Sequence, residues 1–209
     1  MGGPLPKQYQ DLDGKPLIVH TLVKFLRFDP HMEVVIVLAE NHRPQWEAIA
    51  KKHVHIRGLK LATGGASRFH SVRNGLELIE KGRIVGIHDA VRPFVSSKTL
   101  ERCYLMAEKT GGAIPVVDMD ESVRMIEAKK ASVHMDRSLL KRVQTPQVFQ
   151  SELIKEAYQK ANHSDFTDDA SVYEAHVGKI SLVEGNNQNI KITTPTDMKL
   201  AALLIQSAE

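Results

Sequence analysis

The sequence predicts an α/β fold with a mainly parallel sheet, and three observations lead to this prediction. Apolar, β-branched runs alternate with segments of helical spacing at intervals of about 25 residues, as in strand–helix–strand crossovers. The clearest runs carry almost no polar residues, as strands covered on both faces do. The length of 209 residues favours one compact domain, residues 1–209, with a single elaboration.

Six runs are predicted to be strands. The clearest is 32–38, which is β-branched and almost wholly apolar. The others are 59–63, 83–87, 113–117, 179–183 and 190–193.

Helices are predicted between these strands from apolar residues that recur on one face. The three stripes are Ile18, Leu22, Phe25 and Leu26; Phe69, Val72, Leu76 and Ile79; and Leu100, Cys103 and Ala107. A last helix is expected to begin near Thr194, which can act as N-cap, with Pro195 at the first helical position and Asp197 completing a capping box.

Residues 118–143 interrupt this alternation. The segment is charged, poor in large apolar residues and without a clean helical period. We predict that it projects from the domain as an arm, and the plainer alternative is a solvated surface insertion.

Composition narrows the classes of protein that this chain can be. The formal net charge is only +3, with both signs interspersed, which argues against nucleic acid and anionic membranes as partners. The longest apolar run, 34–39, is too short to cross a bilayer, and the N-terminus lacks the apolar core of a signal peptide. The single Cys103 cannot form an internal disulfide, so we expect a cytoplasmic protein.

Two kinds of catalytic site are not expected. The chain has 10 histidines but no H-E-x-x-H and no paired C-x-x-C, and no third ligand has convincing spacing near His53 and His55. There is also no G-x-S-x-G elbow for a serine nucleophile. We therefore predict no resident metal site.

The loops after the predicted strands hold the candidate site, because ligands of such sheets bind beyond the carboxyl ends of the strands. Gly64-Gly65 precede Ser67, which can cap a helix whose free N–H groups favour an anion or a polar ring edge. Arg68 and Ser71 lie one helical pitch apart and can face the same ligand. The alternative is an ordinary tight turn.

A second candidate loop, His88-Asp89-Ala90-Val91-Arg92-Pro93, follows the strand at 83–87. Asp89 is suited to a hydroxyl or a hydrated cation and Arg92 to a phosphate, and a simple ion pair is the alternative. Further cations occupy loop or strand-end positions, and they are Lys7, Arg137 and Lys191.

These motifs occur in one order that is typical of a known family. They are Pro6-Lys7-Gln8-Tyr9, Gly64-Gly65-x-x-Arg68-x-x-Ser71-Val72, His88-Asp89-Ala90-x-Arg92-Pro93, Asp136-Arg137, Gln144-Thr145-Pro146-Gln147, Thr167-Asp168-Asp169 and Glu184-Gly185 through Lys191-Thr193. Over essentially its whole length the chain closely resembles the 2-C-methyl-D-erythritol 4-phosphate cytidylyltransferases of non-mevalonate isoprenoid biosynthesis.

The resemblance implies a Rossmann-like three-layer nucleotidyltransferase fold and a homodimer whose arms swap between subunits. It also implies a Mg²⁺-dependent reaction in which the polyol phosphate attacks the α-phosphorus of CTP and pyrophosphate leaves. The nucleophile is already an anion, so such a site needs cations and alignment rather than a general base.

The resemblance also assigns roles to individual positions. Catalytic roles in stabilising the pentavalent phosphorus fall to Lys7 and Lys191. The nucleotide-binding positions are Gly65, Ala66, Arg68, Ser71, Asp89 and Ala90. The positions for the polyol phosphate are Asp89, Arg92, Ser122, Arg137, Thr145 and Thr167, and Arg137 is expected to serve the neighbouring subunit.

The chain departs from the family pattern in three places. Family members begin with an apolar strand and a glycine-rich loop, and Met1 aligns with a methionine at the end of that loop, so we expect the given sequence to omit this stretch. Ala66 stands where an acidic or polar residue is common, so contacts to the base there are expected from the backbone. The lengthened segment 118–122 leaves the position equivalent to Ser122 open by a few residues.

Two alternatives stay open at this point. One is a ribitol-5-phosphate cytidylyltransferase, which shares the fold, the chemistry and most pocket motifs. The other is a non-catalytic binding protein that lacks the nucleotide loop.

Overall fold

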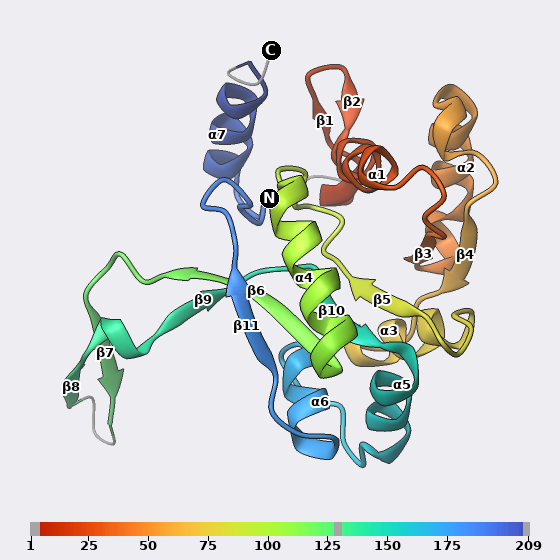
Figure 1. Ribbon diagram of the computed structural model, residues 1–209. Coiled ribbons are helices and arrows are strands. Elements are labelled where there is room, and N and C mark those ends of the chain that lie inside the picture. The colour runs from red at the N-terminus through yellow and green to blue at the C-terminus, as the bar shows by residue number, and fades with distance from the viewer. Residues whose placement is uncertain (1–4, 128–130, 207–209) are drawn as a thin grey trace.

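The computed structural model describes residues 5–127 and 131–206 (Figure 1). Its main sheet has five strands. Four follow the order β11-β6-β10-β5, and β9 pairs with the C-terminal end of β6. Their bounds are β5 (Ile84–Ile87), β6 (Gly112–Asp118), β9 (Lys141–Val143), β10 (Gln147–Gln150) and β11 (Ser181–Glu184). A separate parallel pair is formed by β3 (Val35–Leu38) and β4 (Lys60–Thr63).

The main sheet is mixed, so the prediction of a mainly parallel sheet is wrong. Only β6 and β11 pair in parallel, whereas β10 is antiparallel to both β5 and β6, and β9 is antiparallel to β6. The reason lies in the connection between β6 and β10. The chain leaves through the arm and returns directly to the same sheet without a crossover helix, and a direct return gives antiparallel pairing.

Helices cover both faces of this sheet and give three layers (Figure 1). Buried residues of α4 (Ser97–Thr110) pack against Val148, while the next residue, Phe149, packs against α5 (Ser151–Lys160) and α6 (Asp169–His176). This alternation follows from the period of two along a strand. The remaining helices are α1 (Leu17–Phe28), α2 (Arg43–Lys52), α3 (Arg68–Glu77) and α7 (Pro195–Gln206).

Most of the predicted elements are present. The strands expected at 32–38, 59–63, 83–87, 113–117 and 179–183 correspond to β3, β4, β5, β6 and β11, and the four expected helices are α1, α3, α4 and α7. The capping box of α7 is confirmed, since Asp197 Oδ2 accepts the Thr194 N–H at 2.7 Å and Asp197 N–H bonds Thr194 Oγ1 at 3.1 Å. The strand expected at 190–193 is wrong, because Ile192 N–H bonds Val91 O but no strand pairing in the described residues includes this segment.

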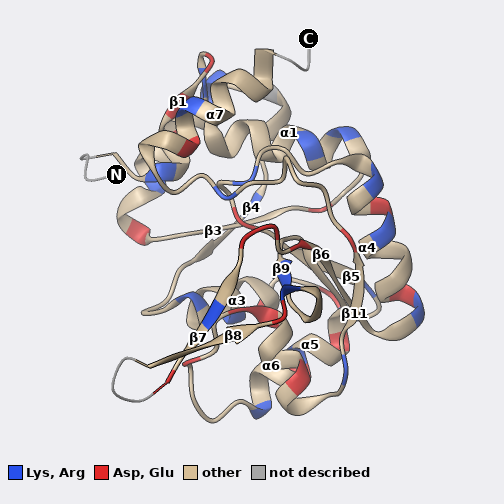
Figure 2. Cartoon of the chain, turned by 90° about the vertical axis from the view of Figure 1, so that its left-hand side faces the viewer, with Lys and Arg blue, Asp and Glu red and all other residues tan. Residues whose placement is uncertain are grey.

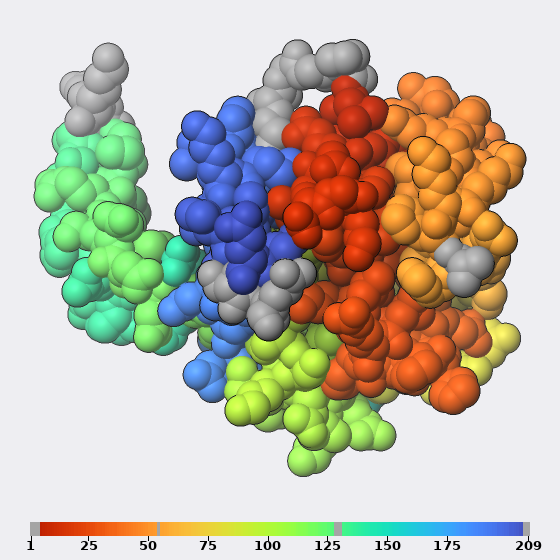
Figure 3. Space-filling view, turned by 90° about the horizontal axis from the view of Figure 1, so that it is seen from above, coloured from red at the N-terminus to blue at the C-terminus, as the bar shows by residue number. Residues whose placement is uncertain are grey.

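The segment 118–143 contains a hairpin of β7 (Val123–Ile126) and β8 (Ser132–Met135) that projects from the body (Figure 1). In the space-filling view the hairpin stands apart from the rest of the chain (Figure 3). It carries exposed apolar side chains, among them Ile126 at 71% and, at its base, Leu139 at 80%. The segment therefore projects from the body as predicted, and its part in a dimer stays a prediction.

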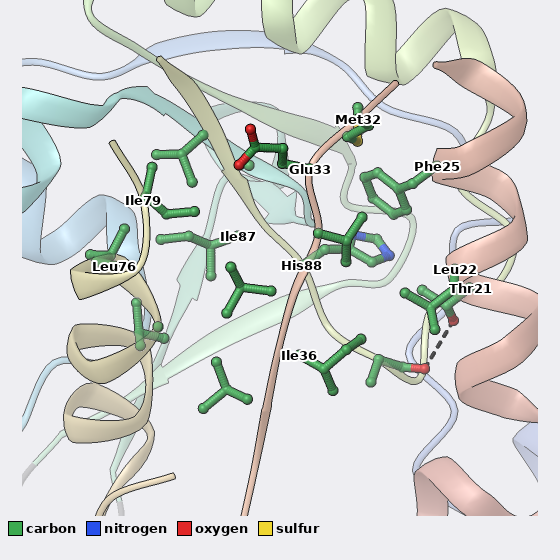
Figure 4. A pocket seen from close by; sticks show the side chains of 18 of the residues that line it. Thr21, Leu22, Phe25, Met32, Glu33, Ile36, Leu76, Ile79, Ile87 and His88 are labelled. Carbon is green, nitrogen blue, oxygen red and sulfur yellow. Dashed lines mark hydrogen bonds between the residues drawn. The ribbon is translucent and has the colours of Figure 1, made fainter. Parts of the chain in front are cut away.

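The β3–β4 pair does not join the main sheet within the described residues. A cavity of about 810 Å³ lies between β3 and β5. Ile36, Leu76, Ile79 and Ile87 point into it (Figure 4).

Charged residues of both signs are spread over the molecule (Figure 2), which agrees with the small net charge. No helix in the described ranges combines the length and apolar character that a membrane span requires.

Candidate active site

The turn after β5 carries a cluster of charged side chains that come from distant parts of the sequence. Asp89 Oδ2 accepts a hydrogen bond from Arg92 Nε at 2.9 Å and lies 3.2 Å from the ammonium nitrogen of Lys191. We call these three residues the Asp89 cluster. The Asp89 and Arg92 side chains are 16% and 12% exposed, whereas Lys191 is 47% exposed, so the lysine is the member that solvent and ligands reach most easily.

The charge of Asp89 is maintained by its neighbours. Burial alone would raise the pKa of this carboxyl, but the hydrogen bond from Arg92 and the positive charge of Lys191 hold the pKa below its ordinary value. Arg92 is also anchored on its other side, because Nη1 donates to the carbonyl oxygen of Asn189 at 2.7 Å. Within the described residues, Nη2 of Arg92 makes no such bond.

The glycine loop between β4 and α3 is organised by Ser71. Its hydroxyl accepts the Gly65 N–H at 3.0 Å and donates to the Ser67 carbonyl oxygen at 2.9 Å. Ser67 caps α3 by accepting the His70 N–H. A Cβ on Gly65 would lie 2.4 Å from His70 Cβ, so the loop needs glycine at this position.

Arg68 is bound to the protein by both of its terminal nitrogens. They donate to the two carboxylate oxygens of Asp169 at 2.9 and 2.6 Å, and Asp169 is fully buried. Burial opposes the charge on Arg68, but the hydrogen bonds and the charge of Asp169 overcome it and raise the pKa of the guanidinium. Arg68 therefore ties the glycine loop to the start of α6, and this geometry gives it a supporting role for that loop.

The start of α6 is further held by a buried glutamine. Gln147 Oε1 accepts the backbone N–H groups of Asp169 at 2.9 Å and Ala170 at 2.8 Å, while its amide nitrogen donates to Asp168. Asp168 in turn caps the helix, as a Thr-Asp-Asp sequence predicts. The exposed Thr167 directly precedes this cap.

The structure brings several of the predicted site residues together. Arg68, Ser71, Asp89 and Ala90 line the same cavity, and Thr145 Oγ1 accepts the Asp89 N–H at 3.1 Å. Lys7 is exposed on the short helix η1 (Lys7–Tyr9), and the next residue, Gln8, lines that cavity.

The other predicted site residues make no hydrogen bond or ion pair with the Asp89 cluster in the described part of the chain. Ser122 and Arg137 belong to the arm, where a terminal nitrogen of Arg137 donates to the Asp120 carbonyl oxygen. Gly65 and Ala66 are exposed on the glycine loop, and Thr167 is exposed before α6.

Sequence reasoning gave no role to a set of buried amides that support this site. Gln144 donates to the carbonyl oxygen of Asn186 at 2.9 Å, and Asn189 donates to the carbonyl oxygen of Thr145 at 2.8 Å. Asn189 and Gln144 are almost fully buried. The sequence offered one indication of this role, which is that both amides lie inside the motifs quoted above. Polar residues next to apolar runs are often buried, and buried polar groups need hydrogen-bond partners.

Side chains of the kinds that bind metals are not clustered in the described part of the chain. No group of three His, Cys, Asp or Glu side chains there is arranged to hold an ion. The Asp89 cluster offers one carboxylate, whose Oδ2 is already shared by two cations.

Comparisons with known proteins agree with this geometry. The family model described as 2-C-methyl-D-erythritol 4-phosphate cytidylyltransferase matches residues 1–207. A protein of that name from Bacteroides fragilis is 45% identical over 205 residues, which cover 98% of this chain and 93% of the relative.

Solved structures give the same result for the fold. The 4-diphosphocytidyl-2C-methyl-D-erythritol synthase of Anaerococcus prevotii is similar with a TM-score of 0.85 at 26% identity, over 98% of this chain and 92% of that one. The 2-C-methyl-D-erythritol 4-phosphate cytidylyltransferase of Thermus thermophilus has a TM-score of 0.82 at 30% identity, over 96% and 94%. The chain belongs to the 2-C-methyl-D-erythritol 4-phosphate cytidylyltransferase family.

Proposed function

We propose that the Asp89 cluster and the glycine loop join CTP to 2-C-methyl-D-erythritol 4-phosphate. A phosphate oxygen of the polyol phosphate forms a bond to the α-phosphorus, and the bond from that phosphorus to the bridging oxygen of the β-phosphate breaks. The products are 4-diphosphocytidyl-2-C-methyl-D-erythritol and pyrophosphate. The convergence of Arg92 and Lys191 on one carboxylate at the end of β5 is the observation that carries this proposal.

In this proposal Lys191 and Lys7 stabilise the charge that builds up on the α-phosphorus. Both side chains are exposed, and Lys191 is held next to Asp89 rather than left free to sample other positions. Preorganised cations at a developing charge are a large source of rate acceleration. No side chain has to act as a general base, because the attacking phosphate is already ionised.

The glycine loop is the proposed site for the cytosine and its ribose. Gly65 and Ala66 are exposed, and Ser71 fixes the loop from within by its two hydrogen bonds. Ala66 has no polar side chain, so its backbone is the group that contacts the base. Asp89 and Ala90 lie at the junction between the nucleotide and the polyol.

The polyol phosphate is proposed to bind between Arg92, Thr145 and Thr167 of one subunit and the arm of a second. Support for a homodimer comes from the exposed apolar side chains of the arm, which include Met125, Ile126 and Leu139. Ser122 and Arg137 would then meet the phosphate or hydroxyls bound in the neighbouring subunit.

Mg²⁺ is proposed to arrive with the triphosphate, whose oxygens are ligands that it prefers. It would neutralise charge on the phosphate oxygens. The side chains that the structure describes do not form a metal cage, so the protein's part is to bind and align the charged substrates. We also propose that the protein works in the cytoplasm.

The test is to assay pyrophosphate release from CTP with methylerythritol phosphate or with ribitol 5-phosphate, each with Mg²⁺ and with a chelator. We expect faster turnover with methylerythritol phosphate and loss of turnover with the chelator. Faster turnover with ribitol phosphate would reverse the assignment of the substrate. Absence of CTP binding in calorimetry would instead favour the non-catalytic alternative.

A further inference from the structure

His88 is the first residue after β5, and both nitrogens of its imidazole are occupied by protein groups. Nε2 lies 3.0 Å from the Arg92 carbonyl oxygen, and Nδ1 lies 2.9 Å from the Thr145 hydroxyl. The ring of Phe25 packs edge-on against it with centroids 4.8 Å apart, as the close-up of the cavity shows (Figure 4). The imidazole is thus held from three sides.

The partners of the ring determine where its proton lies. A carbonyl oxygen only accepts hydrogen bonds, so Nε2 carries the hydrogen and donates it to Arg92. Burial lowers the pKa of His88 to about 4, and the ring is therefore neutral at physiological pH with a lone pair on Nδ1. It follows that the Thr145 hydroxyl donates to Nδ1.

The Thr145 oxygen has a second fixed partner, because it accepts the backbone N–H of Asp89 at 3.1 Å. The Arg92 N–H bonds the Asp89 carbonyl oxygen at 3.1 Å and closes the same turn. The hydrogen bonds therefore run from the Asp89 N–H through Thr145 and His88 to the Arg92 carbonyl oxygen. They connect the backbone of two Asp89-cluster members to the loop that holds Thr145.

We infer that His88 is a positioning residue, which holds Thr145 and the turn 89–92 in a single arrangement and directs the Thr145 proton inward. Thr145 is then left with an oxygen lone pair, which suits a hydroxyl hydrogen of the polyol and disfavours a phosphate oxygen. The polyol phosphate must find its phosphate partners elsewhere, and Arg92 offers its Nη2. In this role His88 acts through the hydrogen bonds to its neighbours.

The inference rests on the proposed function, and it is tested by kinetics of four variants. His88→Phe keeps an aromatic ring and removes both hydrogen bonds, and Thr145→Val keeps the shape and removes the hydroxyl. We expect each substitution to raise the KM for methylerythritol phosphate about tenfold, which is the effect of losing one hydrogen bond in a site. The KM for CTP should rise by a smaller factor. The double variant should be no worse than the poorer single one, because both changes break the same bond. Thr145→Ser should lie much closer to the wild type than Thr145→Val.

His55→Phe, at an exposed histidine in η3 (Val54–Ile56), is the matched control. Additive effects of the two single changes would overturn the inference. It would also be overturned if His88→Phe lowered kcat only in proportion to the folded fraction, with both KM values unchanged.

A second measurement needs no substitution of His88 and covers the case in which that variant does not fold. The ¹⁵N shifts of the His88 ring in the wild-type protein should show a neutral ring protonated at Nε2 at pH 7. A charged imidazolium, or a proton on Nδ1, would contradict the inferred proton order. A wild type without turnover would contradict the proposed function alone, because the ring measurement does not depend on activity.

Discussion

Lys191 Nζ and Asp89 Oδ2 are 3.2 Å apart, although the two residues are far apart in the sequence. The acid is largely buried while the lysine is half exposed, so the pair holds a solvent-accessible cation beside Asp89. An arriving phosphate has to compete with Asp89 for this ammonium group. The contact therefore fixes the lysine in place without removing it from the reach of a ligand.

Replacement of this lysine is predicted to affect catalysis far more than folding. Lys191→Ala should lower turnover by more than about a hundredfold, because it removes a charge that stabilises the transition state. The melting temperature should change little, since exposed ion pairs contribute little to stability. Steady-state kinetics and a thermal melt check both parts, with the exposed Lys199→Ala of α7 as control. Turnover close to that of the wild type would rule out the catalytic role.

The buried carboxylate of Asp169 is predicted to be a stability residue. Asp169→Asn removes the charge that pairs with Arg68 and also alters the acceptor of the Tyr158 hydroxyl, which bonds Asp169 at 2.7 Å. Only the Asp169 side of this pair is buried, so breaking it should lower the free energy of unfolding by about 2 kcal/mol. Urea denaturation gives the value, and the exposed Asp165→Asn is the matched control. Equal midpoints for both variants would contradict the prediction.

Stability is predicted to fall as the pH drops below about 6.5, the ordinary pKa of histidine. The pKa of His88 is lowered to about 4 by burial, so between these two values the unfolded chain binds a proton that the folded chain does not. Stability therefore rises with pH across this window, by at most about 1.4 kcal/mol per pH unit for one group. His53, whose pKa is also lowered by burial, acts in the same direction.

The measurement is urea denaturation of the wild type and of His88→Phe between pH 5 and 7. The variant should show a flatter dependence of unfolding free energy on pH. Identical slopes would show that His88 takes up its proton as readily in the folded protein as in the unfolded chain.

Arg137 is predicted to act on the active site of the neighbouring subunit. Arg137→Ala should raise the KM for methylerythritol phosphate, because it removes a cation from that site. Mixing it with Lys191→Ala should restore activity, since half of the dimers are mixed and each mixed dimer has one intact site, which gives about a quarter of the wild-type activity. No gain on mixing, in a sample shown to contain mixed dimers, would place Arg137 in its own subunit's site.

The sequence predicts the elements whose apolar residues are regularly spaced. The stripe of Ile18, Leu22 and Phe25 identifies α1, and all three residues are buried. By contrast α2 was not predicted, because its sequence is polar and only Trp46 among its residues is fully buried. The run at 190–193 alternates as a strand does, but an alternating pattern does not supply a neighbouring strand to pair with.

The site was predictable as a set of motifs and less so as a set of contacts. Asp89, Arg92 and Lys191 were all identified, and their ion pairs follow from where the turn after β5 meets the segment before α7. The pair of Arg68 with the buried Asp169 spans 101 positions, and no local pattern in the sequence reports such a distance. The same holds for His88, whose role depends on a partner in another loop.

The cavity between β3 and β5 has a consequence for how the molecule opens. All four residues of β5 are partly exposed, whereas three of the four residues of β10 beside it are buried. Among the described residues β3 pairs only with β4 and β5 only with β10, so no sheet hydrogen bonds join the two strands across the cavity. Amide protons of β3 and β5 that face the cavity should therefore exchange with solvent earlier than those of the buried β10.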